Sequence, residues 1–381
     1  YPQTAVWQFQ QGYATDLAPQ VRELTSLTRA ENIMYEVSGA VRKVGGRIRL
    51  NSTAIDSGAN LVGMYDFWQT FSGADSQHFV VITGTGTVQD LGIDGTASAI
   101  TGSAVIGTDT IPVFAQLNDV LTIWFDDNST PLQWEGTGNV ATLNAPVGRG
   151  GIRHVNRLFC WGTQADPSRL YWSGLGDPTL WSGNSDTGSI YVDRNDGDRI
   201  VSLVSYKDRL FIFKGPNKGS IHMLSGRTPS DFSLIKLVEG IAVQGPNAAV
   251  HVQDDVWYMA QDGIYSLAAT EQFGDFEQSR LTRLLDTYFR TRLYRTGKNM
   301  HRISAVDYKA KSCALWCVRL VDTAESQDVL GLSYIRSDAI GIQPFTWTGR
   351  SCLSSAIRIN APLRAAREVV FGQTDGYVTR Q

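Results

Sequence analysis

The chain has few of the residues that build disulfide scaffolds, metal clusters or membrane spans. It contains four cysteines and five histidines in 381 residues, too few cysteines to cross-link a chain of this length. No Cys-x-x-Cys pair typical of zinc and redox sites occurs. No run approaches the ~20 apolar residues of a membrane-spanning helix, and the N-terminus lacks the basic-then-apolar pattern of a secretion signal. We therefore expect a soluble protein of a reducing compartment with no membrane-spanning segment.

The chain also lacks an excess of either charge. It has 34 basic and 37 acidic residues and a net charge of −3. Because non-specific affinity for DNA comes from neutralising phosphates, this balance argues against a protein that holds nucleic acid through overall positive charge. DNA can still pass close to such a protein without being retained.

Common catalytic motifs are missing as well. There is no HExxH, no GxSxG and no Walker sequence, since Asn299 follows Gly297-Lys298 where Ser or Thr is required. Cys313 and Cys317 would point to the same face of a strand, as buried structural thiols do. The histidines occur singly, so each is expected to be an ordinary strand residue rather than a metal ligand. We expect no catalytic, cofactor-binding or metal site, and we predict that the chain is not an enzyme.

What the sequence does contain is a repeated pair of short apolar strands separated by a polar turn. The strands are rich in Val, Ile, Phe, Tyr and Trp, the residues that half-buried sheet positions favour. Successive pairs are separated by roughly the ~40–50 residues that four strands and their turns require. The seven pairs are residues 78–82 with 84–88, 120–125 with 132–134, 157–161 with 169–172, 209–213 with 220–224, 256–259 with 263–267, 314–318 with 330–334, and 369–371 with 376–378.

This spacing predicts an all-β fold, a β-propeller of about seven blades within a range of six to eight. A small four-stranded sheet cannot bury both faces alone, and radial stacking solves this while protecting the sheet edges. The expected organisation is an irregular N-terminal lead-in over residues 1–55, followed by the propeller over residues 56–381. A strand from the lead-in that completes the last blade would close the ring. Asp262-Gly263 and Asp375-Gly376 predict hairpin turns with positive φ at the glycine.

One inserted helix is expected near residues 279–293, where apolar residues recur at intervals of three and four. The apolar positions are Leu281, Leu284, Leu285, Tyr288 and Phe289, and the flanking basic residues are Arg280, Arg283, Arg290 and Arg292. One interpretation is a helix laid across the propeller with a solvated basic face. The other is that these four arginines contact a neighbouring subunit.

The densest cluster of side-chain oxygens lies at residues 193–199. It could wrap a calcium ion, but Gly197 stands where the fifth-position ligand of an EF-hand belongs and Val204 where its terminal Glu should be. Asp, Asn and Gly are also ordinary turn residues. We favour a turn that connects two blades.

An ordered set of motifs resembles the phage tail and neck propeller proteins, which include the tail nozzle (tail tubular) proteins of short-tailed phages and packaged-DNA stabilisation proteins. The resemblance covers about residues 30–290 and rests on the order of the motifs more than on any one of them. The matching segments are AEN at 30–32, GAVRK at 39–43, RLFCWGT at 157–163, DPSRLYWS at 166–173, GDP at 176–178, Trp181, DGDRI at 196–200, DRLFIFK at 208–214, GP at 245–246, DGIY at 262–265 and the helix up to Phe289.

The resemblance implies a virion structural protein of the tail, assembled in the host cytoplasm. Such a subunit would form a homo-oligomeric ring, commonly a hexamer, stacked on the portal or an adaptor protein and on other tail proteins. The ring would continue the DNA channel, retain the genome and release it at infection, with transient and non-specific passage of DNA. The alternative from another class is a carbohydrate-binding or glycan-cleaving propeller that recognises a host receptor, which as a glycosidase would need two carboxylates facing one pocket.

Overall fold

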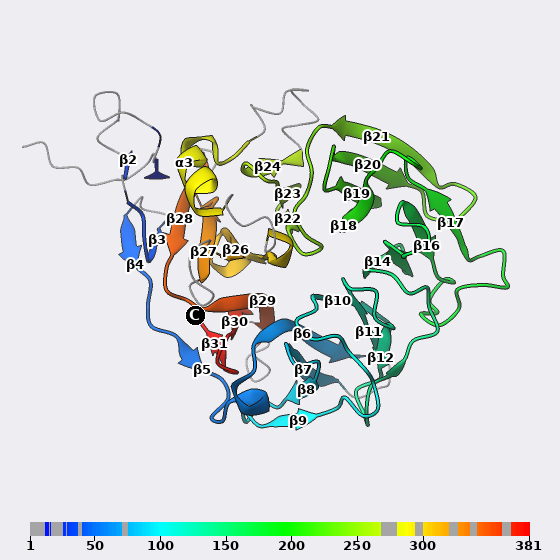
Figure 1. Ribbon diagram of the computed structural model, residues 1–381. Coiled ribbons are helices and arrows are strands. Elements are labelled where there is room, and N and C mark those ends of the chain that lie inside the picture. Colours follow the sequence, from blue (N-terminus) through cyan, green and yellow to red (C-terminus); the bar gives the residue numbers. More distant parts are fainter. Residues whose placement is uncertain are drawn as a thin grey trace, which may run out of the picture.

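The computed structural model describes residues 12–14, 16, 26–27, 29–36, 40–70, 75–267, 280–293, 300–319, 327–335, 341–359 and 367–381. Seven antiparallel sheets stand around one central axis (Figure 1). The fold is a seven-bladed β-propeller, which confirms the predicted all-β class. The first member of each predicted pair lies in the second strand of one blade, and the second member lies in the third strand, except that residues 84–88 and 376–378 mostly form the turns that precede β8 and β31.

The first four blades follow one another along the chain, each with its strands in sequence order from the axis outward. Blade 1 contains β6 (Leu61–Gln69), β7 (Ser76–Thr83), β8 (Val88–Leu91) and β9 (Ala97–Ala99). Blade 2 contains β10 (Pro112–Leu117), β11 (Val120–Phe125), β12 (Leu132–Trp134) and β13 (Ala141–Thr142). Blade 3 contains β14 (Gly150–His154), β15 (Arg157–Trp161), β16 (Arg169–Trp172) and β17 (Gly188–Tyr191). Blade 4 contains β18 (Arg199–Tyr206), β19 (Arg209–Gly215), β20 (Ser220–Ser225) and β21 (Ser233–Glu239).

Blades 5 and 7 depart from this scheme at their outer strands, whereas blade 6 follows it. Blade 5 has three strands in the described part, β22 (Ala249–Val252), β23 (Asp255–Met259) and β24 (Ile264–Ser266). Blade 6 contains β25 (Ser304–Tyr308), β26 (Cys313–Arg319), β27 (Gln327–Ser333) and β28 (Gln343–Trp347). Blade 7 contains β29 (Cys352–Ile359), β30 (Arg367–Gln373), β31 (Val378–Arg380) and β5 (Ile48–Arg49).

Burial explains why the second strands were visible in the sequence. A second strand is covered on both faces by adjacent blades, so it reads as an apolar run rather than an alternating one. β15 is buried at every residue, whereas the outermost strand β13 is exposed at both of its residues. The core is accordingly built between blades, with fully buried Trp124, Trp161 and Trp316 among its largest side chains.

A strand from the N-terminal segment closes the ring. β5 pairs antiparallel with β31, with Thr379 opposite Arg49 and Arg380 opposite Ile48. The buried Asn51 side chain fixes this junction: its Nδ2 donates to the Gly376 carbonyl (3.0 Å), and its Oδ1 accepts from the Val378 amide (2.8 Å). Blade 7 is therefore held together by both ends of the described chain.

The described strands that precede β5 pack outside the ring. β3 (Ile33–Tyr35) and β4 (Val41–Lys43) form a hairpin beside β28, and β1 (Gly12–Tyr13) pairs in parallel with β2 (Ser26–Leu27). The hairpin is joined to blade 6 by the Asn32 amide, which donates to the Thr346 carbonyl (2.7 Å), and by the Trp347 indole, which donates to the Ile33 carbonyl (2.9 Å).

The two Asp-Gly turns differ from each other. Gly376 has φ 76°, as predicted, but Gly263 is not in the positive-φ region, so that part of the prediction is wrong. Gly263 is needed for space instead, because a Cβ at this position would lie 2.8 Å from Arg280 Cδ and 2.8 Å from Thr282 Oγ1. Residues after the turn thus pack directly over blade 5.

The inserted helix is present and short. It runs as a 3-10 turn (Arg283–Leu285), the α-helical turn α3 (Asp286–Tyr288) and a π turn (Phe289–Leu293). Its apolar stripe is buried at Leu285, Tyr288 and Phe289 against a core that joins blades 4, 5 and 6. No helix in the described ranges is long and apolar enough to cross a membrane.

Candidate functional site

The four arginines predicted to contact a neighbouring subunit have different environments. Arg280 is mostly buried and forms ion pairs with Asp286 (2.7 Å) and Asp262 (3.5 Å), so it ties the helix to blade 5. Arg283 is exposed, and Arg290 is 77% exposed with its guanidinium 3.6 Å from Asp286. The Arg292 side chain lies outside the described residues. Among the three arginines of this set whose side chains are described, Arg283 and Arg290 are exposed and Arg280 is not.

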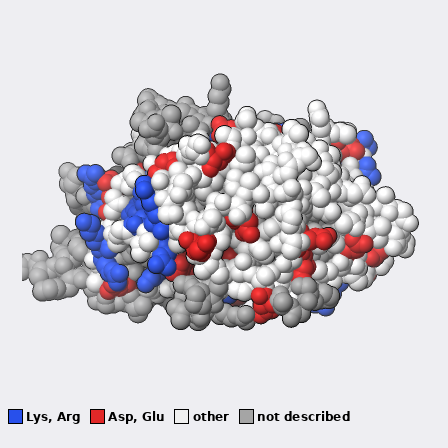
Figure 2. All heavy atoms as spheres, turned by 90° about the horizontal axis from the view of Figure 1, so that it is seen from below, with Lys and Arg blue, Asp and Glu red and all other residues white. Residues whose placement is uncertain are grey.

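A second group of basic residues lies at one edge of the molecule. Lys and Arg gather at the left end of Figure 2, on the side where β4 and β5 lie in Figure 1. Arg42, Lys43 and Arg49 are exposed there. Arg49 also stacks over the Tyr377 ring at 3.7 Å, which orders its guanidinium at the closing edge of blade 7.

The innermost strands of the blades surround the central axis. A cavity of about 220 Å³ lies between them, lined by side chains of these strands such as Tyr65, Phe114 and Leu203. A neighbouring cavity of about 380 Å³ shares Tyr65 and Phe114 with it. The Tyr65 and Phe114 rings stack with their centroids 5.4 Å apart.

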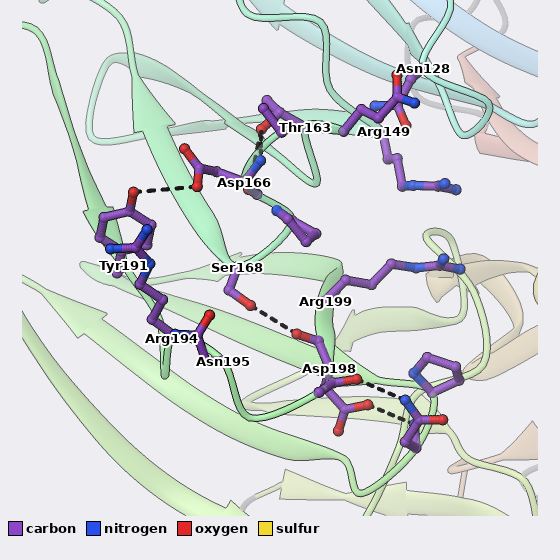
Figure 3. A pocket seen from close by; sticks show the side chains of 16 residues that line it. Asn128, Arg149, Thr163, Asp166, Ser168, Tyr191, Arg194, Asn195, Asp198 and Arg199 are labelled. Carbon is purple, nitrogen blue, oxygen red and sulfur yellow. Dashed lines mark hydrogen bonds between the residues drawn. The ribbon is translucent and has the colours of Figure 1, made fainter.

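A pocket lies on one face, between the loops of blades 2, 3 and 4. It encloses about 690 Å³ and is lined by the connections that precede β14 and β18 and by the turns that follow β11, β15 and β19. Figure 3 shows the Arg149 and Arg199 side chains extending in the same direction on one side of this pocket, with Tyr191 and Arg194 on the opposite side.

Arg149 and Arg199 give the pocket its charge. Arg149 Nη1 donates to the Asp126 backbone carbonyl, while the partly buried Arg199 guanidinium has no hydrogen-bond or ion-pair partner among the described residues. Burial and the nearby positive charge of Arg149 both lower the pKa of Arg199 below its ordinary value, and only Asp126 acts in the opposite direction. Two guanidinium groups therefore repel each other here without a dedicated counter-ion.

The acidic residues around this pocket are already engaged. The Asp198 carboxylate accepts from the backbone amides of Asn217, Lys218 and Gly219 at 2.7–2.9 Å. The Asp126 carboxylate accepts from the Thr110 hydroxyl (2.9 Å) and the Ile111 amide (2.6 Å). Both carboxylates are used to fix loops, so neither is directed at the Arg199 guanidinium.

Asp166 on the opposite wall is engaged in the same way. Its Oδ1 accepts from the Tyr191 hydroxyl (3.3 Å), and its Oδ2 lies 3.4 Å from Arg169 Nη1. The Tyr191 ring is covered in turn by the Arg194 guanidinium, 4.5 Å from its centroid. This wall is consequently pre-formed without any ligand.

The acid-rich loop at residues 193–199 is the connection between β17 and β18. Asp193 forms an ion pair with Lys236 (2.7 Å), whose hydrogen bond lowers the pKa of that carboxyl, and Asp196 pairs with the buried Lys214 (2.7 Å). Its carboxylates therefore point to separate partners. No group of three or more His, Cys, Asp or Glu among the described residues is arranged to hold a metal ion.

The cysteines and most of the histidines have structural surroundings. All four cysteines are buried and free of disulfides, and burial raises the pKa of the Cys160 thiol. Four histidines have separate neighbours: His78 lies against Asp90 (2.8 Å), His154 against Ser205 (2.8 Å), His222 against Ser220 (3.0 Å) and His251 on the Tyr206 ring (4.5 Å).

Sequence reasoning identified the segment 193–199 but missed the pocket beside it. Arg149 precedes β14 and Arg199 begins β18, so fifty positions separate two residues that the radial arrangement brings together. The available signal was positional: Arg149 stands immediately before the inner strand of blade 3, and Arg199 is the first residue of the inner strand of blade 4. Loops at the ends of inner strands all converge on the axis of a propeller.

Comparison with protein-family models and with curated proteins gave no match. Among solved structures, the chain is similar to the β-propeller domain of Cps50 (Swd1) from Myceliophteria thermophila, with a TM-score of 0.52 and 11% identity over 88% of this chain and 99% of that one. It is also similar to YCF48 bound to a D1 peptide (TM-score 0.47, 11% identity, 88% of this chain and 94% of that one).

A third similar structure is PorZ, a component of the type IX secretion system of Porphyromonas gingivalis, with a TM-score of 0.45 and 11% identity. The match covers 88% of this chain and 37% of PorZ. At this level of identity the likeness to Cps50 supports the propeller fold alone, because one fold hosts many unrelated functions.

Proposed function

We propose that the chain is a structural subunit of a phage tail, a nozzle (tail tubular) or neck component that forms part of the DNA channel, retains the genome and takes part in its ejection. The observation that carries the proposal is that motif segments of the resemblance, although separate in the sequence, contact each other in this fold. Asp196 and Lys214 come from two separate motif segments, and the Lys214 ammonium lies 2.7 Å from the Asp196 carboxylate.

Other motif residues hold the blades together in the same manner. Arg157 of the RLFCWGT motif is buried and forms an ion pair with Asp186, whose pKa is lowered by that hydrogen bond. Gly245 allows a close approach between blades, since a Cβ there would lie 2.3 Å from the His301 carbonyl oxygen. The motifs therefore encode a rigid propeller rather than a set of catalytic groups, which supports a structural role.

In our proposal the DNA path is the bore of a ring of subunits, and each propeller is one block of its wall. The net charge of −3 suits such a wall, because each neutralised phosphate would add affinity and slow the sliding of DNA.

A ring of identical subunits needs a head-to-tail contact, and we place one side of it at the helix. Arg283 and Arg290 are exposed on a segment whose apolar face is fixed in the core, so they present charge on a rigid support. Closed rings arise from heterologous contacts of this kind. The ring, expected to be a hexamer, would stack on the portal or an adaptor and on other tail proteins in the virion.

Size-exclusion chromatography with light scattering, followed by native mass spectrometry, tests the assembly. The chain is expected to form one closed oligomer, and the double variant Arg283→Glu with Arg290→Glu is expected to shift it towards monomer. Arg227→Glu is the matched control, because Arg227 is exposed and paired with Asp208 on a loop remote from the helix. A chain that stays monomeric, or a control that dissociates as readily as the double variant, would count against the proposed contact.

The glycan-cleaving alternative makes a different prediction in the same preparation. A glycosidase needs two carboxylates facing one pocket, whereas Asp166 and Asp198 beside the large pocket are occupied by internal hydrogen bonds. A monomer that releases sugar from a panel of bacterial surface glycans would favour the alternative over the tail subunit.

A further inference from the structure

Several buried or partly buried arginines of this protein have an acidic partner, which Arg199 lacks. Arg157 has Asp186, Arg280 has Asp286, and Arg302 has Asp109. Arg199 is partly buried, faces a pocket and has no such partner among the described residues. A charge that has lost part of its hydration without gaining a counter-ion is destabilising, so its presence calls for a ligand that supplies the missing charge.

We propose that the pocket between blades 2, 3 and 4 binds a small polar ligand through a phosphate or carboxylate group held between Arg149 and Arg199. Guanidinium groups are the side chains best suited to such groups, because their fork of N–H donors matches two oxygens of a planar carboxylate or a phosphate. Figure 3 shows the two side chains extending into the same space, and it draws no hydrogen bond from the Arg199 guanidinium to another residue of the pocket.

The charge around the two guanidinium groups favours an anion. Asp126 is the acidic residue that acts on Arg199, and its carboxylate already accepts from Thr110 and Ile111. On the axial side lie Arg302, paired with Asp109 at 3.4 Å, and His301, whose pKa is lowered mainly by burial and further by the nearby arginines. An anion placed between Arg149 and Arg199 would relieve this repulsion.

The rest of the pocket can accommodate the body of a ligand. Its volume of about 690 Å³ falls within the range of ordinary small-molecule sites. The wall formed by Tyr191, Arg194 and Asn195 is polar, and the Tyr191 hydroxyl is held by Asp166. We infer a ligand with hydroxyl or amide groups beside its anionic group. This inference depends on the pocket and not on the tail assignment, so the two can fail independently.

Isothermal titration calorimetry with pyrophosphate and with citrate, each at an ionic strength matched with sodium chloride, tests the proposal. At least one probe is expected to bind saturably, and preference for one of the two identifies phosphate or carboxylate as the anionic group. Arg199→Gln and Arg149→Gln are each expected to weaken binding by about tenfold or more. Arg227→Gln, which changes an exposed arginine outside the pocket, is expected to bind as the unmodified chain does.

Thermal unfolding provides the second readout. Without ligand, Arg199→Gln is expected to melt at the same temperature as the unmodified chain or higher, because an unpaired charge has been removed. The bound probe is expected to raise the melting temperature of the unmodified chain and not that of the variant. Absence of saturable binding by both probes would overturn the proposal, as would equal binding by Arg199→Gln. A lower melting temperature for that variant without ligand would instead assign Arg199 a purely structural role.

Discussion

Replacing Lys214 by Met tests whether the motif segments stabilise the propeller through one buried charge. Lys214 is 0% exposed, and its ammonium donates to the Val192 carbonyl (2.6 Å), the Asp193 carbonyl (2.8 Å) and the Asp196 carboxylate (2.7 Å). These three bonds use all the donors that an ammonium group has. Methionine has a similar length and no donor, so the substitution removes the bonds while changing the packing little.

The expected loss is large because the acceptors remain in place. Breaking a buried ion pair by removing one partner costs about 3–5 kcal/mol. Asp196 keeps part of its exposure to solvent, so a value near the lower end, about 3 kcal/mol, is expected for Lys214→Met. Asp196→Asn should cost less, since its side-chain oxygen can still accept a hydrogen bond from the ammonium.

Urea unfolding provides the measurement. Tryptophan fluorescence and circular dichroism should report one coincident transition before free energies are compared. A double-mutant cycle with Lys214→Met and Asp196→Asn should then give a coupling energy of 0.5 kcal/mol or more, on the order of that for contacting residues. A loss below about 1 kcal/mol for Lys214→Met, the worth of an ordinary hydrogen bond, would refute the assignment of Lys214 as a central support.

Three further predictions concern other parts of the fold. Burial lowers the pKa of His154 from 6.5 to about 4, so as the pH falls the unfolded chain binds a proton at this histidine before the folded chain does. The free energy of unfolding should therefore fall by about 3 kcal/mol as the pH drops from 6.5 to 4. Urea titrations at several pH values should show a weaker fall for His154→Asn. The four buried cysteines should resist a thiol reagent in the native state and react after unfolding, and rapid labelling of the folded chain would contradict their burial. Asn51→Ala should lower the melting temperature, by loss of two buried hydrogen bonds worth about 1 kcal/mol each, and an unchanged melting temperature would argue against Asn51 as a lock on ring closure.

The second strand of each blade could be predicted from the sequence because burial on both faces leaves a clear apolar run. β15 and β19 were recognisable for this reason, and so were the strands that follow them. Outer strands such as β13 are short and exposed, so they carry no comparable pattern. The helix was predicted from its apolar stripe, but its division into 3-10, α and π turns reflects how Leu285 and Phe289 fit the core of blade 5.

The candidate site could not be predicted in the same way, because it depends on which loops the ring brings together. Arg149 and Arg199 belong to different blades and share no local motif. Asp262-Gly263 correctly indicated a turn, but the reason for the glycine was not visible in the sequence. Gly263 is required because Arg280 and Thr282 pack against it, and not because of its φ. Both the pocket and the need for Gly263 depend on packing between residues far apart in the sequence.

The central claim is that this propeller is one block in the wall of a ring through which DNA passes. Cryo-electron microscopy of the phage particles that contain the chain tests this claim most directly. We predict density for a ring of propellers in the tail or neck, with the DNA path in the bore between subunits. Particles whose tail and neck density has no place for this seven-bladed fold would contradict the account.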